Sequence, residues 1–380
     1  MKSVVILGSA HPLRGGLASY NERLAQAFQD AGDQVQIYTF SLQYPNFLFP
    51  GKTQYSESPA PKDLNIRISV NSVNPINWLK VGNEISKQKP DLLIFKYWLP
   101  FMGPCFGTIA RRVKRNGHTK IITILDNVIP HEHRPGDRLF TRYFLKPIDA
   151  FIAMSTSVLE DLGQFNITKP RVESPHPLFD NFGKPVSRKL ALSELNLDPS
   201  IRYLLFFGFI RDYKGLDLLL HAMAEESMRN IPVKLIIAGE FYSNEEKYRN
   251  LISELNLEDR IIDCTNFIAD EEVYKYFCAA DVVVQPYKNA TQSGVTQIGY
   301  QFEKPMIVTN VGGLPEIIPD GKVGFVVEPN SKDLAVSIAR FYNENKLEEF
   351  TANAREEKKK YSWEMMVQRI NNLCGLIKSL

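Results

Sequence analysis

Residues 201–222 read IRYLLFFGFIRDYKGLDLLLHA, and the change of pattern within this stretch sets the fold. The run IRYLLFFGFI (201–210) has the length and the aromatic and apolar content of a buried strand. The segment after Gly215 begins a helical pattern, and Arg211 and Lys214 stand between the two. A buried strand that leads directly into a helix is typical of a parallel α/β sheet.

The same alternation runs along the whole chain. Buried parallel strands are predicted at 3–8, 34–40, 91–97, 120–125 and 149–155, and then at 201–210, 233–240, 260–264, 281–287, 305–310 and 324–329. A Pro-rich stretch, SPHPLFDNFGKPVS (174–187), separates the two groups. The chain of 380 residues is long for one core. We therefore expect an α/β fold of two Rossmann-like, doubly wound domains that face a cleft. The predicted domains are residues 1–185 and 186–360, with 361–380 as a helix that returns to the first domain.

Composition excludes several classes of protein. A net charge of +2 and a pI near 8.2 give no support for nucleic-acid binding. Four scattered cysteines without C-x-x-C spacing indicate neither a zinc site nor disulfides, which fits a reducing cytoplasm. The first apolar run is too short for a signal segment or a membrane span, so any membrane association is expected to be peripheral. The basic clusters at 111–115 and 358–360 fit solvated helix faces, or alternatively loose contact with an anionic membrane.

Two loops carry anion-binding features. Arg211 and Lys214 converge on the start of the following helix, where two cations and the helix dipole suit a diphosphate; a solvated charge pair is the alternative. Gly15 and Gly16 precede the first helix, as in a phosphate-binding turn or a plain flexible turn. Gly8 lies seven residues before Gly15, so the G-x-G-x-x-G dinucleotide fingerprint is absent.

Four motifs of the second half resemble, in their order, those of the retaining glycosyltransferases of family 4, which have the GT-B fold. They are GFIRDYKGLDLLL, IIAGE, AADVVVQPY and KPMIVTNVGGLPEII. The resemblance extends to RGGLASYNERLA, SPHPLF and YSWEMM, and so covers nearly the whole chain. It implies transfer of a sugar from a nucleotide donor with retention at the anomeric carbon. It also implies that Arg211 and Lys214 hold the donor diphosphate, and that Gly15 and Gly16 close over it from the first domain.

The sequence departs from this family in the second domain. Members usually carry two glutamates eight positions apart, and those positions fall here on Ala290 and Ile298 or, one residue earlier, on Asn289 and Gln297. Glu303 is expected to be a solvated residue near a helix end. Backbone amides at the start of the helix would replace the missing carboxylates. The predicted donor contacts in this segment are Gln292, Ser293, Gly294, Val295 and Gln297.

The remaining candidates follow other strands. Asp126 stands where the family often has a histidine. It could bond a sugar hydroxyl or assist a proton transfer. Alternatively, it is an N-cap or turn residue. Glu240 ends IIAGE, where it either meets the nucleotide or caps a helix. Gly313 and Glu316 occupy a further strand-to-helix turn, and Glu316 is expected to bond a ribose or sugar hydroxyl.

The predicted function is that of a retaining, metal-independent glycosyltransferase of bacterial polysaccharide or glycoconjugate synthesis. The nucleotide-sugar is its donor and a saccharide or glycolipid its acceptor, with no cofactor. The enzyme is expected in the cytoplasm, with the inner face of the membrane as the alternative. A nucleotide-sugar epimerase of the GT-B fold and a catalytically silent sugar-nucleotide binding protein are the other functions considered. No D-x-D pair is present to hold a divalent metal, so arginine, lysine and helix N-termini take its place.

Overall fold

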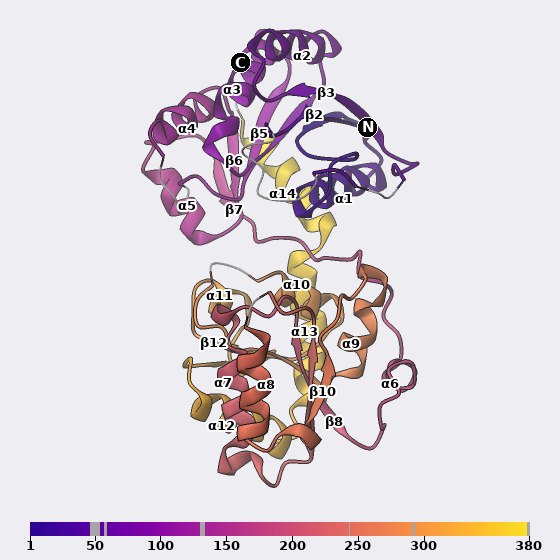
Figure 1. Cartoon of the computed structure of the whole chain (residues 1–380). Helices are drawn as coiled ribbons and strands as arrows, with labels where there is room; N and C mark the ends of the chain where they lie inside the picture. Colours follow the sequence, from indigo (N-terminus) through magenta and orange to yellow (C-terminus); the bar gives the residue numbers. More distant parts are fainter. Residues whose placement is uncertain (46–53, 57–58, 130–133, 243, 291–292, 378–380) are drawn as a thin grey trace. The chain divides into compact units, whose positions relative to one another are not determined.

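A computed structural model describes residues 1–45, 54–56, 59–129, 134–242, 244–290 and 293–377. The chain divides into two compact units, shown in Figure 1. Unit 1 comprises Met1–His176 and Trp363–Leu380, and unit 2 comprises Pro177–Ser362. Among the described residues, no helix combines the length and the apolar character needed to cross a bilayer.

Unit 1 is built on a seven-stranded sheet in which all pairings between neighbouring strands are parallel. The strand order is β3-β2-β1-β4-β5-β6-β7. The strands are β1 (Ser3–Leu7), β2 (Gln34–Leu42), β3 (Asn65–Asn71), β4 (Leu92–Tyr97), β5 (Lys120–Leu125), β6 (Ala150–Ala153) and β7 (Arg171–Glu173). The helices are α1 (Gly16–Asp30), α2 (Pro75–Gln88), α3 (Gly103–Lys114), α4 (Asp137–Leu145), α5 (Thr156–Gly163) and α14 (Trp363–Leu376).

Helices cover both faces of this sheet, because successive side chains of a strand point to opposite faces. Val4 and Ile6 of β1 pack into a core with α1 and α14. Val5 and Leu7 of the same strand pack into a second core with α2, α3, α4 and α5. The C-terminal helix α14 thus completes the core of unit 1.

Unit 2 repeats the plan with six parallel strands in the order β10-β9-β8-β11-β12-β13. The strands are β8 (Arg202–Phe207), β9 (Val233–Ala238), β10 (Ile261–Cys264), β11 (Val282–Gln285), β12 (Met306–Thr309) and β13 (Gly324–Val327). The helices are α6 (Arg188–Glu194), α7 (Leu216–Ala224), α8 (Glu245–Glu254), α9 (Val273–Ala279), α10 (Gly294–Gln301), α11 (Leu314–Ile317), α12 (Ser331–Asn343) and α13 (Leu347–Glu357). Alternate residues of β8 again enter two cores, one on each face.

Each sheet reverses its strand order at one point. In unit 1 the reversal lies between β1 and β4, and in unit 2 between β8 and β11. The loops that leave such neighbouring strands in opposite directions open a crevice at the carboxyl ends of the strands, which is where ligands bind in doubly wound sheets. The loop that contains Arg211 and Lys214 follows β8, and α10 follows β11.

The predicted fold class is confirmed, and each predicted strand is present. The sequence did not reveal β3 and β7, which form the two edges of the sheet in unit 1. Most side chains of β3 are exposed or half-buried, with Ile68 52% exposed. An edge strand that pairs on one side need not be continuously apolar, so β3 lacks the pattern of a buried strand.

Candidate functional site

The loop after β8 is fixed against the segment after β11. A short 3₁₀ turn at Asp212–Lys214 leads into α7, and the Lys214 amide donates to the Arg211 carbonyl over 2.9 Å. Gly215 has φ +69°, and a Cβ there would lie 1.9 Å from the carbonyl oxygen of Pro286. Only glycine fits this position. The close packing places Arg211 and Lys214 at the point where the strand order reverses.

Lys214 is a buried cation without a carboxylate. Its exposed fraction is 9%, and no ion pair is formed by it in the described part of the chain. Its Nζ lies 5.8 Å from the ring centroid of Tyr287. Burial, followed by the charge of Arg211, lowers the pKa of Lys214 to about 8. A buried charge without a counter-ion is unfavourable, so this position is suited to an anionic ligand.

Nearby acids are occupied by other lysines. Asp212 accepts from Lys247 Nζ over 2.8 Å, and Asp217 accepts from Lys288 Nζ over 2.8 Å. The pKa of the Asp212 carboxyl is lowered by the bond from Lys247 and by the charge of Lys288. These pairs leave the charge of Lys214 uncompensated within the loop.

Arg211 stacks on an aromatic ring. Its guanidinium carbon lies 4.0 Å from the ring centroid of Tyr242, which follows β9. No carboxylate pairs with Arg211 among the residues that the structure describes. A stacked guanidinium keeps its N–H groups in one plane, a geometry that matches two oxygens of a phosphate.

The N-terminus of α10 lies beside Lys214. A Cβ built on Gly208 would lie 2.8 Å from Lys214 Nζ and 3.8 Å from Val295 Cγ2, so Gly208 lies between these side chains. The helix begins at Gly294, and the side chain of its N-cap residue does not cap it, because the Ser293 hydroxyl bonds the Tyr287 hydroxyl at 3.1 Å. The first amides of α10 are therefore available to an anion. Gln292 lies outside the described residues.

Gln297 lies one turn into α10 and is 2% exposed. Its Oε1 has no hydrogen-bond partner among the described residues. A buried carbonyl oxygen that lacks a donor is costly, so the amide is suited to a ligand hydroxyl that reaches it. Ala290 and Ile298, the other positions for the family glutamates, pack into the core of unit 2.

Glu303 lies near the end of α10, as predicted, but the prediction that it is a solvated residue is wrong. Glu303 is an ion-paired residue, bonded by Arg355 Nε at 2.8 Å and Lys358 Nζ at 2.6 Å. Burial raises the pKa of this carboxyl, but the two cations outweigh burial and hold the pKa below its usual value. With φ +55°, Glu303 takes the conformation that a glycine would favour and ties α10 to α13. It is therefore a structural acid.

The backbone of Glu240 contacts the loop that carries Arg211 and Lys214, called here the cation loop. Its carbonyl accepts from the Ile210 amide at 2.8 Å. Gly239 has φ +125°, and a Cβ there would lie 2.6 Å from the Gly208 carbonyl oxygen. The loops after β8 and β9 therefore meet backbone to backbone. Gly313 and the exposed Glu316 lie further along the same sheet edge, at and after the start of α11, which follows β12.

Three exposed aromatic residues at this edge were not predicted from the sequence. Phe209 follows β8, Tyr242 follows β9 and Phe267 follows β10, with exposed fractions of 53%, 66% and 73%. Exposed rings in loops that leave the carboxyl ends of strands are suited to stacking on a planar or sugar ring. They could have been predicted as ligand contacts, because each is an aromatic residue that stands a few positions after a strand.

In unit 1, Gly15 and Gly16 form an open turn before α1. Gly15 has φ +100°, which a residue with a side chain rarely adopts, and both glycines are exposed. Among the described residues, no side chain caps the fifteen-residue helix, whose N-cap residue is Gly15. The structure places this pair after β1, at the reversal point of its own sheet.

Asp126 is the counter-ion of a buried lysine. Lys96 Nζ lies 2.5 Å from Asp126 Oδ1, and Lys96 is 2% exposed. The ammonium also lies 3.6 Å from the ring centroid of Tyr20. Burial lowers the pKa of Lys96, and Asp126 opposes that effect. The N-cap alternative is wrong, since α4 begins at Asp137. Lys96 was missed, although a lysine inside the apolar run DLLIFKY was a signal.

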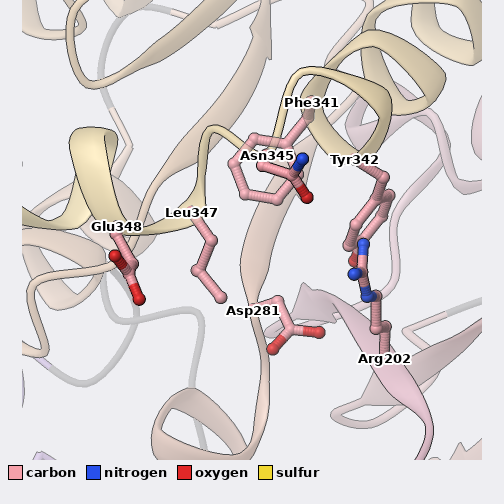
Figure 2. Close-up of a pocket in the computed structure, with 7 residues that line it drawn as sticks. All are labelled: Arg202, Asp281, Phe341, Tyr342, Asn345, Leu347 and Glu348. Atoms are coloured by element: carbon pink, nitrogen blue, oxygen red, sulfur yellow. The ribbon is translucent and has the colours of Figure 1, made fainter.

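A separate pocket of about 350 Å³ lies at the amino ends of β8 and β11, because Arg202 begins β8 and Asp281 directly precedes β11. Figure 2 shows the side chains that line it. Arg202, Asp281 and Tyr342 are among its lining residues. Asp281 accepts from Arg188 Nε and from the Tyr203 amide, so it ties this edge together. The pocket contains none of the predicted site residues and lies at the edge opposite Arg211 and Lys214.

Comparison with known proteins identifies the family. The family model "Glycosyltransferase Family 4" matches residues 14–176, and "Glycosyl transferases group 1" matches residues 188–359. An uncharacterised glycosyltransferase of Methanocaldococcus jannaschii is 25% identical over 300 residues, which cover 78% of this chain and 79% of that protein. A D-inositol 3-phosphate glycosyltransferase of Nocardioides is 27% identical over 53% of this chain and 48% of its own length. The chain thus spans about half the length of that relative.

Solved structures share the fold over nearly the whole chain. The Anabaena protein HepE in complex with UDP has a TM-score of 0.70 at 17% identity, covering 99% of this chain and 100% of that one. Sucrose-phosphate synthase from Thermosynechococcus elongatus has a TM-score of 0.66 at 19% identity and covers 98% of both chains. With two doubly wound sheets and both family models matched in order, the chain belongs to the family 4 glycosyltransferases of GT-B fold.

Proposed function

We propose that this protein is a retaining, metal-independent glycosyltransferase that moves a sugar from a nucleotide-sugar to a hydroxyl of a saccharide or glycolipid. A role in bacterial polysaccharide or glycoconjugate synthesis fits this chemistry. The observation that carries the proposal is the buried, uncompensated ammonium of Lys214, with Arg211 on the same loop and the uncapped N-terminus of α10 beside it.

This arrangement matches the charge that develops in the reaction. As the bond from the anomeric carbon to the diphosphate breaks, negative charge gathers on the departing phosphate oxygen. In this proposal Lys214, Arg211 and the first amides of α10 stabilise that charge. The acceptor hydroxyl attacks from the leaving-group side and its proton passes to that phosphate oxygen, so no strong protein base is needed. The new bond to the acceptor oxygen forms on the face of the anomeric carbon from which the phosphate departs, so the configuration of that carbon is retained.

Two positive groups also explain why no divalent cation is needed. A metal would neutralise the diphosphate in a site rich in carboxylates. Here the acids of the cation loop are paired with Lys247 and Lys288. Among the described residues, no group of three or more histidine, cysteine, aspartate or glutamate side chains forms a metal-binding cluster. Turnover is accordingly expected to persist in excess EDTA.

The donor is assigned to residues 186–360 and the acceptor to residues 1–185. A uridine diphosphate sugar is the first donor to test, because the structural relative HepE was solved with UDP and with UDP-glucose. Tyr242 and Phe267 are the rings suited to the base, and Gln297, Glu240 and Glu316 the groups suited to ribose and sugar hydroxyls. Asp126 belongs to the acceptor side.

The first experiment is a thermal-shift screen with UDP, GDP, ADP and their sugars, because a ligand of the native state raises the unfolding midpoint. Release of the nucleoside diphosphate is then measured with a panel of acceptors. Arg211→Ala is expected to weaken binding of the diphosphate about tenfold to a hundredfold, since charge-assisted hydrogen bonds contribute roughly 1.5–3 kcal/mol.

The matched control is Arg340→Ala on α12, whose guanidinium pairs with Glu344 and packs over the ring of Phe325. Unchanged diphosphate affinity in Arg211→Ala contradicts the proposed site. Donor binding without release of nucleotide across the acceptor panel favours a silent binding protein over an enzyme.

A further inference from the structure

Helix α4 of unit 1 carries apolar side chains on its outer surface. Leu139 is 68% exposed, and Phe140 and Tyr143 are each 38% exposed. The opposite side of the helix packs into the core through Thr141, Phe144 and Leu145. Residues four apart lie on one side of a helix, so Leu139 and Tyr143 form an apolar strip with Phe140 next to it. Phe140 and Tyr143 also pack partly against α3, where the hydroxyls of Tyr143 and Thr108 are hydrogen-bonded at 3.0 Å. Such a strip is suited to contact with another apolar phase.

A row of cations runs beside this strip. Arg138, Arg142 and Lys146 are spaced four residues apart, and all three are exposed. None of them pairs with a carboxylate in the portion of the chain that the structure describes, and Arg138 donates only to the Gln164 carbonyl. Like charges at this spacing repel one another. The row is therefore an uncompensated positive edge along the apolar strip.

A further cation flanks the strip from α3, which packs beside α4. The guanidinium carbon of Arg111 lies 3.7 Å from the ring centroid of Tyr143. Its N–H groups donate to the carbonyls of Gly107 and Tyr143 over 2.7 Å each. These bonds involve no acid, so the positive charge of Arg111 remains uncompensated. The apolar strip thus has positive charge on both sides.

The basic clusters that stand out in the sequence are different. On α3, Lys114 pairs with Asp149. In the second cluster Lys358 pairs with Glu303, Lys359 with Glu356 and Lys360 with Glu357. These pairs neutralise Lys114 and all three lysines of the cluster at 358–360. In contrast to the cluster at 358–360, α4 combines uncompensated cations with exposed apolar side chains.

We propose that this face of α4 docks on an anionic lipid surface. Leu139, Phe140 and Tyr143 would enter the headgroup layer, while Arg138, Arg142 and Lys146 meet lipid phosphates with their apolar stems alongside. The combination favours lipid over nucleic acid, because a phosphate backbone would use the cations and leave the apolar strip uncovered. The inference is independent of the proposed sugar transfer and locates a membrane contact on one helix.

The experiment is flotation of the full chain with vesicles of phosphatidylcholine, with and without about 30% phosphatidylglycerol. Binding is expected only to the anionic vesicles and should weaken as salt rises. Leu139→Asp and the double variant Arg142→Glu/Lys146→Glu should each lower vesicle affinity about tenfold or more, since each basic side chain near the surface contributes roughly a factor of five. Circular dichroism checks that the variants fold, as these side chains are exposed.

Matched controls distinguish this surface from general charge or hydrophobicity. Ile76→Asp replaces a residue that is 79% exposed in the first turn of α2. Lys189→Glu/Lys332→Glu makes the same change of net charge on α6 and α12. Both controls should bind vesicles like the wild type. Equal binding to neutral vesicles, or equal losses in the controls, overturns the proposal.

Two further outcomes also overturn it. If Leu139→Asp changes the mass of the protein in solution while vesicle binding stays the same, the apolar strip contacts a second copy. If a short duplex DNA competes with the vesicles and the α4 charge variant alone loses DNA binding, the basic row serves nucleic acid.

Discussion

Replacement of Lys214 by methionine should stabilise the protein at neutral pH and abolish its affinity for diphosphates. Methionine has a similar length and no charge, so it fills the same space without the cost of burying an ammonium. The pKa of Lys214 lies at about 8 in the native protein, against an ordinary value of 10.5. At about 1.4 kcal/mol per pKa unit, the native state is penalised by at most about 3.5 kcal/mol. That is a large fraction of the stability of a typical domain.

The sign of the pH dependence follows from proton linkage. Below pH 8 Lys214 is charged in both states, so the native state carries the full penalty and the methionine variant gains the full difference. As the pH rises from about 8 to 10.5, the native protein releases this proton while the unfolded chain still holds it, so the wild type becomes relatively more stable. The advantage of Lys214→Met should therefore be largest near pH 6.5 and disappear above about pH 10.5.

The assay is urea unfolding at pH 6.5 and at the highest pH the protein tolerates, together with UDP binding by calorimetry. The three tryptophans, Trp78, Trp98 and Trp363, all lie in unit 1, so their emission follows that unit. The far-ultraviolet dichroism follows both units, and the shift should appear in the part of the transition that belongs to unit 2.

Lys304→Met is the matched control. Lys304 is a half-buried lysine of unit 2 whose pKa is also lowered by burial, but its ammonium donates to the Ala280 carbonyl over 2.9 Å. Its removal leaves a carbonyl without its donor, so this variant should be destabilised and should retain UDP affinity. A loss of stability in Lys214→Met at pH 6.5, or UDP binding that survives the substitution, would refute the reasoning.

Three further predictions concern the same loops and Asp126. UDP affinity should fall about fivefold between pH 8 and pH 9, because the free protein then loses the Lys214 proton that the bound diphosphate requires; a flat calorimetric profile would contradict this. Gly215→Ala should destabilise unit 2 by more than about 2 kcal/mol in urea unfolding, since its Cβ would lie 1.9 Å from a carbonyl oxygen, whereas Gly16→Ala meets open space and should cost less than about 1 kcal/mol. Asp126→Ala should destabilise unit 1 by roughly 3–5 kcal/mol, measured by tryptophan emission, because it leaves the buried Lys96 unpaired. The double variant Asp126→Ala/Lys96→Met should recover much of that loss, and an unchanged stability in the single variant would mean that Asp126 has no structural role.

Strands buried on both faces could be read from the sequence because they are continuous apolar runs. The strand β3 could not, since it lies at an edge and exposes most of its side chains. Arg211 and Lys214 were placed at the carboxyl edge correctly, because the end of a strand and the start of a helix are local features. Lys96 was hidden within an apolar run, and its pairing with Asp126 joins residues thirty positions apart.

Charge shows the same division between what is local and what depends on the fold. The runs at 111–115 and 358–360 are basic in the sequence, yet in the structure acids from distant segments neutralise Lys114 and Lys358. The basic row of α4 is less conspicuous in the sequence, because its members are spaced four apart among apolar residues. Only its helical geometry brings these cations together and leaves them without acids.

The sequence by itself determined the two doubly wound sheets, the family and the loop that carries Arg211 and Lys214, because periodicity and short motifs act over a few residues. Tertiary structure decided that Lys214 is buried without a counter-ion while the acids beside it are taken. It also decided that Glu303, which follows the segment where family members carry their paired glutamates, is a structural acid held by Arg355 and Lys358. Burial and charge pairing depend on segments far apart in the chain, and only folding brings those segments together.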